Sequence, residues 1–159
     1  MRQLMSLAVA AALVVVNAEP TGAASGAAKR DIVRGRATHL GADPPYPRIT
    51  VFINASSDPD GSNPRGVFVL ESPEIGQQRR GEVTCLSVNG NMATIGIRIV
   101  KAEDPDVVGK GELFNFVDNE DGDQVAGYPI TATPPTVCPP LFFSVPVVSG
   151  RYRISDATT

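Results

Sequence analysis

The sequence has little of the side-chain chemistry that enzymes use. Histidine, the commonest general acid or base, occurs once among 159 residues, as His39. No Gly-x-Ser-x-Gly elbow, His-Glu-x-x-His pair or glycine-rich phosphate loop is present. His39 follows a strand pattern and precedes turn residues, so we expect a surface histidine at a strand end. The sequence therefore predicts no catalytic residue and no cofactor, and it favours a protein that is not an enzyme.

Tryptophan is absent, and aromatic side chains that could stack on a sugar are few. Four phenylalanines lie in strand patterns and are expected in the core: Phe52, Phe68, Phe114 and Phe116. The tyrosines remain as candidate surface platforms: Tyr46, Tyr128 and Tyr152. A tyrosine with its ring packed and its hydroxyl in water is the ordinary alternative. The aromatic residues therefore do not indicate a carbohydrate-binding surface.

Basic residues are too few for a nucleic-acid partner. The formal net charge is −3, and nonspecific affinity for phosphate backbones requires clustered lysine and arginine. The one long apolar run, Leu4 to Val16, follows Arg2 and precedes the small residue Ala18. This is the plan of a secretory signal peptide over residues 1–18, and the run is too short to cross a bilayer. We expect a secreted or cell-envelope protein with no membrane span in its mature chain.

The remaining sequence is expected to form one domain. Residues 19–30 consist mainly of alanine, glycine, serine and threonine, which predicts a disordered lead-in. Residues 31–159 have the usual length of a single domain. The partner of this domain is expected to be an extracellular or cell-envelope ligand of unknown identity.

Short β-branched and aromatic runs alternate with clusters of glycine, proline, asparagine and aspartate, and helical periodicity is missing. Proline cannot donate to a strand ladder, so the 14 prolines mark the connections. Eight strands result: Ile32–Leu40, Arg48–Ala55, Gly66–Glu71, Gly81–Val88, Met92–Val100, Gly111–Val117, Gln124–Thr131 and Val147–Ser155. The pattern predicts an all-β fold, an antiparallel sandwich or barrel of about eight strands.

A hairpin is predicted at Asn89-Gly90, because both central positions of a type I′ turn need a positive φ. With these two residues as the loop, Val88 lies opposite Asn91 and Leu86 lies opposite Ala93. A three-residue loop with a bulge would shift one strand. The apolar face of the hairpin is expected to hold five side chains: Leu86, Val88, Ala93, Ile95 and Ile97.

This hairpin, GEVTCLSVNGNMATIG over Gly81–Gly96, resembles part of an uncharacterised family of small secreted actinobacterial β-domain proteins. The segment VSGRYRISDA over Val148–Ala157 is similar to their C-terminal strand, and Phe116–Gly122 to a stretch between. Ile97 stands where a second glycine tends to follow Gly96 in that family. The resemblance implies a secreted β domain and carries over no catalytic residue.

The two cysteines, Cys85 and Cys138, are expected to form a disulfide because an exported chain meets an oxidising compartment. Two buried free thiols are the alternative. The bridge would attach the proline-rich segment Thr133–Pro146 to the hairpin. We expect it to help Leu141, Phe142 and Phe143 reach the core.

Acidic residues cluster around Gly122 and form a weak calcium candidate: Asp118, Glu120, Asp121 and Asp123. The spacing does not match an EF-hand, and Asp-Gly stretches are typical of tight turns, so the turn interpretation is preferred. Three functions follow from the sequence. The first is a non-enzymatic binding or scaffolding domain, the second a small extracellular hydrolase using the 118–123 acids, and the third a self-associating structural module.

Overall fold

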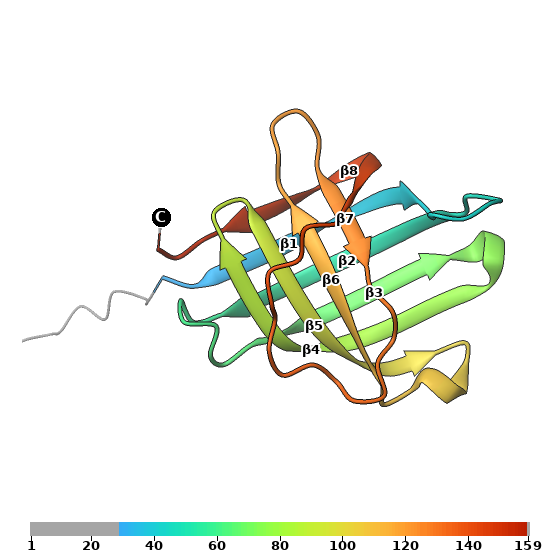
Figure 1. Ribbon diagram of the computed structural model, residues 1–159, viewed down its shortest axis with the longest axis horizontal. Helices are drawn as coiled ribbons and strands as arrows, with labels where there is room; N and C mark the ends of the chain where they lie inside the picture. Colours follow the sequence, from blue (N-terminus) through green and yellow to red (C-terminus); the bar gives the residue numbers. More distant parts are fainter. Residues whose placement is uncertain (1–28, 159) are drawn as a thin grey trace, which may run out of the picture.

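A computed structural model describes residues 29–158, which form a closed antiparallel barrel of eight strands in sequence order (Figure 1). The all-β prediction is confirmed, and the barrel is the correct one of its two alternatives. The signal peptide predicted for residues 1–18 and most of the lead-in lie outside the described residues. Within residues 29–158, no helix has the length and apolarity needed to cross a membrane.

The strands are β1 (Asp31–Leu40), β2 (Arg48–Ser57), β3 (Arg65–Ser72), β4 (Gln77–Asn89), β5 (Met92–Ala102), β6 (Gly111–Val117), β7 (Gln124–Gly127) and β8 (Val145–Ser155). Two short 3-10 helices, η1 (Pro73–Ile75) and η2 (Pro105–Val107), follow β3 and β5. All eight predicted strands are present. The main differences are that β4 begins earlier than predicted and β7 is shorter.

Alternate residues of each strand point into the barrel, as the two-residue period of a strand requires. On β1, Val33, Ala37 and His39 are buried while Arg34 and Arg36 are exposed. An eight-stranded barrel has an interior just wide enough for side chains to fill it. The interior of this barrel is accordingly a packed core along most of its length.

Aromatic rings fill the centre of that core. Phe68 and Phe114 lie 4.2 Å apart between ring centroids, and Phe116 meets Tyr152 edge to face at 4.8 Å. The expectation that Phe52 belongs to the core was wrong: it is 39% exposed, because its position on β2 points outward. Tyr152 is fully buried, so it is not a surface platform.

The β4–β5 hairpin has its predicted apolar face but a different register. Asn89 pairs with Met92, so the two loop residues are Gly90 and Asn91 rather than Asn89 and Gly90. Leu86 therefore lies opposite Ile95. The pairing of β4 with β5 is irregular between Val83 and Cys85. The alternation of inward and outward side chains shifts by one residue there, so that Val83 and Leu86 both face the core.

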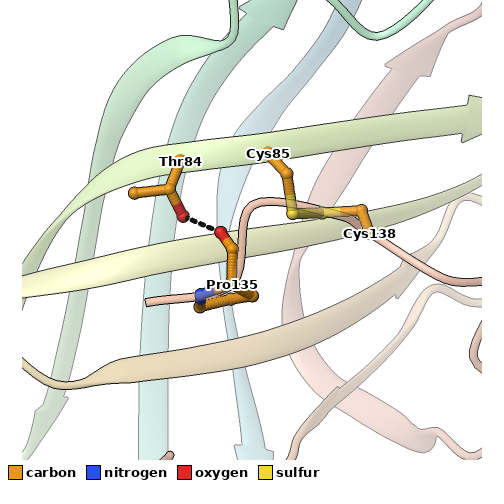
Figure 2. The surroundings of a disulfide bond; sticks show 4 residues. All are labelled: Thr84, Cys85, Pro135 and Cys138. Carbon is orange, nitrogen blue, oxygen red and sulfur yellow. Dashed lines mark hydrogen bonds between the residues drawn. A yellow bond between two sulfur atoms is a disulfide. The ribbon is translucent and has the colours of Figure 1, made fainter. Parts of the chain in front are cut away.

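The return segment, residues 128–144, connects β7 to β8 across the outside of the barrel (Figure 1). Its anchor is the predicted disulfide between Cys85 and Cys138, with Cα atoms 5.6 Å apart (Figure 2). Beside the bridge, the Thr84 hydroxyl donates to the Pro135 carbonyl oxygen at 2.6 Å. The bridge therefore fastens the segment to the outer face of β4.

The return segment does not carry its apolar residues into the core as expected. Phe142 is 85% exposed and Phe143 is 60% exposed, and Leu141 is half-buried. The reason is that the segment crosses the outside of the barrel, where Cys138 is its one buried residue. Phe142 and Phe143 instead stand at the surface near the start of β8.

Candidate functional site

One end of the barrel contains a cavity of about 200 Å³. It lies where β1 and β3 end, at the tips of their arrows in Figure 1, and where β2, β4, β6 and β8 begin. We call it the mouth cavity. Its lining is His39, Leu40, Gly41, Ala42, Ile49, Leu70, Arg79, Glu112, Phe114, Ala126, Gly127, Tyr128, Phe143 and Val145.

A buried ion pair forms part of the lining of the mouth cavity. Arg79 lies opposite the inward-facing Leu70, and Glu112 opposite the inward-facing Ile97, so both charged side chains point into the barrel. The Arg79 guanidinium nitrogen is 2.8 Å from a Glu112 carboxylate oxygen, with the side chains 15% and 7% exposed. Charges this far from water are retained in proteins mainly where they are paired.

Burial dominates the protonation of Glu112. Loss of water raises the pKa of the carboxyl from 4.5 to about 7, although the nearby Arg79 charge acts in the opposite direction. Desolvation disfavours the ionised form of any carboxyl group. The net charge of the pair therefore changes near neutral pH. As the pH rises, the Glu112 carboxyl changes there from a protonated hydrogen-bond donor to an anion.

His39 is the third polar group of the mouth cavity. The prediction of a surface histidine was wrong, because position 39 falls on the inward face of β1 and the residue is 7% exposed. Burial lowers the pKa of the imidazole, which favours the neutral ring. Its Nδ1 atom is buried without a hydrogen-bond partner among the described residues. A buried polar atom left in this state is costly and uncommon.

The outer rim of the mouth cavity is largely apolar. Leu40 and Phe143 are both exposed and both line the cavity, together with Val145. Phe143 is held by Tyr128, whose hydroxyl bonds to the amide nitrogen and the carbonyl oxygen of Phe143, each at 3.2 Å. The buried lining is mixed, with Arg79, Glu112 and His39 beside the apolar Leu70, Phe114 and Ala126, whereas the entrance is largely apolar.

The acidic loop 118–123 lies away from this cavity and joins β6 to β7. β7 pairs with β8 only at Gln124 and Val125. Beyond these pairs, two carboxylates accept hydrogen bonds from β8 amides: Asp123 from Tyr152, and Asp118 from Ile154 at 3.0 Å. The side chains thus take the place of a strand ladder between the β6–β7 loop and the end of β8.

The structure therefore gives two of the four calcium candidates a structural role. Asp118 and Asp123 bind backbone, whereas Glu120 and Asp121 are exposed. In residues 29–158, no group of three or more histidine, cysteine, aspartate or glutamate side chains is placed to hold a metal ion. A groove of about 510 Å³ runs along this loop and β8, but its floor contains the carboxylates already bonded to β8.

We expect Asp123→Ala to lower the free energy of unfolding by about 2 kcal/mol, because the buried Tyr152 amide would lose a charged acceptor. Asp121→Ala is the matched control in the same loop, and its exposed side chain should change stability by less than about 0.5 kcal/mol. Equilibrium unfolding in urea measures both. A large rise in melting temperature with calcium that Asp121→Ala abolishes would show instead that the loop is a calcium site.

Sequence reasoning missed Arg79 and Glu112 as members of a site. Glu112 had a usable signal, because it shares the two-residue period of Phe114 and Phe116 in the predicted strand and so had to point inward. Arg79 had no such signal, since it precedes the predicted strand Gly81–Val88. They lie 33 residues apart in the sequence and meet because β4 and β6 both pair with β5, on its two sides.

Comparison with models of protein families, with curated proteins and with solved structures found no match to the chain.

Proposed function

We propose that the barrel is a non-enzymatic binding protein that holds a small molecule in its mouth cavity. The observation that carries the proposal is the buried Nδ1 atom of His39, which has no partner within residues 29–158. It lines the same cavity as the Arg79–Glu112 pair. An apolar pocket with a few converging polar groups is the usual form of a small-molecule site. A ligand atom bonded to His39 would remove the cost of the unpaired nitrogen.

The size of the mouth cavity limits the ligand. Eight-stranded barrels hold at most one small ligand when their interior is not filled. The cavity of about 200 Å³ corresponds to about seven water volumes at roughly 30 Å³ each. A small molecule, or one end of a longer molecule, fits this space.

We propose further that this binding takes place outside the cell or in the cell envelope. The apolar N-terminal run supports export, and the disulfide between Cys85 and Cys138 is compatible with an oxidising compartment. The resemblance of Gly81–Gly96 and Val148–Ala157 to secreted actinobacterial β-domain proteins supports the same location. We propose membership of that family on these segments.

A fragment screen by nuclear magnetic resonance tests the binding function. The ¹⁵N-labelled protein is titrated with small acids, alcohols and amines, and we expect amide shifts to cluster around His39, Arg79 and Tyr128. His39→Leu, which fills the same space without a polar atom, should abolish them. Thr50→Val is the control, because Thr50 bonds to Thr38 and does not line the cavity. Shifts confined to residues elsewhere, or no shifts, would contradict the proposal.

A further inference from the structure

We propose that the mouth cavity takes the carboxylate end of a small amphiphilic acid, bound to Arg79, with the apolar part of the ligand against Leu40 and Phe143. The inference rests on the binding function proposed above. It adds the chemical class and the orientation of the ligand.

Arg79 has donors to spare for a second carboxylate. A guanidinium carries five N–H donors. Among the described residues Arg79 gives one to Glu112 at 2.8 Å and one to Gln77 at 3.2 Å. The side chain is 15% exposed, so an anion arriving there is screened less than it would be in open water. The planar guanidinium also matches the geometry of a carboxylate.

Glu112 is a counterion that a ligand can replace. Burial raises the pKa of its carboxyl to about 7, so taking up one proton from water neutralises it at little cost near neutral pH. The other titratable groups facing the cavity are Arg79 on β4, His39 on β1 and Tyr128 in the return segment. Burial lowers the pKa of the His39 ring, which favours its neutral form. When Glu112 is protonated, the charge of Arg79 has no carboxylate beside it, and a ligand carboxylate neutralises that charge.

The rim of the cavity fits the other end of such a ligand. Leu40 is 42% exposed and Phe143 is 60% exposed, and both line the cavity. Burying this apolar surface under an alkyl chain is favourable in proportion to the area covered. The buried charge of Arg79 and the exposed apolar rim of Leu40 and Phe143 together match the two ends of an amphiphilic acid.

Titration calorimetry with octanoate, 1-octanol and octylamine tests the ligand class, since these probes share one chain length and differ in head group. We expect octanoate to bind most tightly at pH 6. Its affinity should fall roughly tenfold from pH 6 to pH 8, because binding above the pKa of Glu112 requires proton uptake. Glu112→Gln should bind octanoate with little dependence on pH.

Two arginine variants test whether octanoate binds in the mouth cavity or at an arginine on the surface. Arg79→Gln should lose octanoate affinity by at least tenfold while retaining its affinity for 1-octanol, which also shows that the cavity is still folded. Arg98→Gln is the matched control, since Arg98 forms an exposed pair with Glu82 and does not line the mouth cavity. It should bind all three probes as the unchanged protein does.

The outcomes distinguish the ligand class from the binding function. Preference for octylamine or 1-octanol at the mouth cavity overturns the carboxylate inference and leaves the binding function standing. Octanoate binding that survives Arg79→Gln also overturns the inference. If none of the three probes binds, the inference fails, and the binding function fails as well only if the fragment screen is also negative.

Discussion

Replacing both cysteines, as Cys85→Ala with Cys138→Ala, should lower the free energy of unfolding by about 4 kcal/mol. The two residues are separated by 53 positions, and the chain-entropy model assigns about this value to closing a loop of that length. A whole domain has only about 5–15 kcal/mol of net stability. The double variant should therefore melt far below the unchanged protein.

Equilibrium denaturation with guanidinium, followed by circular dichroism, measures this loss. Thr84→Ala serves as the control, because it removes the neighbouring bond to Pro135 and keeps the bridge. A single hydrogen bond of this kind contributes about 1 kcal/mol. If the cysteine double variant loses no more than Thr84→Ala, the loop entropy does not govern the stability of the barrel.

The strands could be predicted because their signals are local. Runs such as Ile32–Leu40 and Arg48–Ala55 are bounded by prolines and glycines, and they recur in the structure as β1 and β2 with small changes at their ends. The register of the β4–β5 hairpin could not be predicted from local signals. The preference of Asn89-Gly90 for a type I′ turn is weaker than the packing that sets Leu86 opposite Ile95.

The choice between a sandwich and a barrel is not encoded locally. It depends on β1 pairing with β8, for example Ile32 with Ser155 at opposite ends of the domain. The mouth cavity could not be predicted from the sequence for the same reason. His39 shares the inward period of Val33 and Ala37, yet only barrel closure turns the end of β1 into the wall of a cavity.

The free energy of unfolding should fall as the pH rises from about 4.5 to about 7, through the ionisation of Glu112. The pKa of this carboxyl is raised to about 7 in the folded barrel, because burial raises it by more than the attraction of Arg79 lowers it. The folded state therefore holds the proton over a range in which the unfolded chain releases it. The stabilising effect of the protonated carboxyl is complete below about pH 4.5 and is lost as the pH passes 7.

Comparison with Glu112→Gln isolates this effect from other titrating groups, because glutamine has nearly the shape of the protonated acid. The two proteins should be about equally stable at pH 4.5. One pKa unit corresponds to about 1.4 kcal/mol, so above pH 7 the glutamine variant should be more stable by about 3 kcal/mol. Urea unfolding at half-unit pH intervals measures the difference.

The exposed pair of Arg98 and Glu82 provides the control for that comparison. Its side chains are 54% and 56% exposed, and pairs in water contribute little to stability. Glu82→Gln should therefore differ from the unchanged protein by less than about 0.5 kcal/mol at every pH. If Glu112→Gln is instead the less stable protein at pH 8, the attraction of Arg79 outweighs burial, and Glu112 is a fixed counterion that no ligand replaces by protonation.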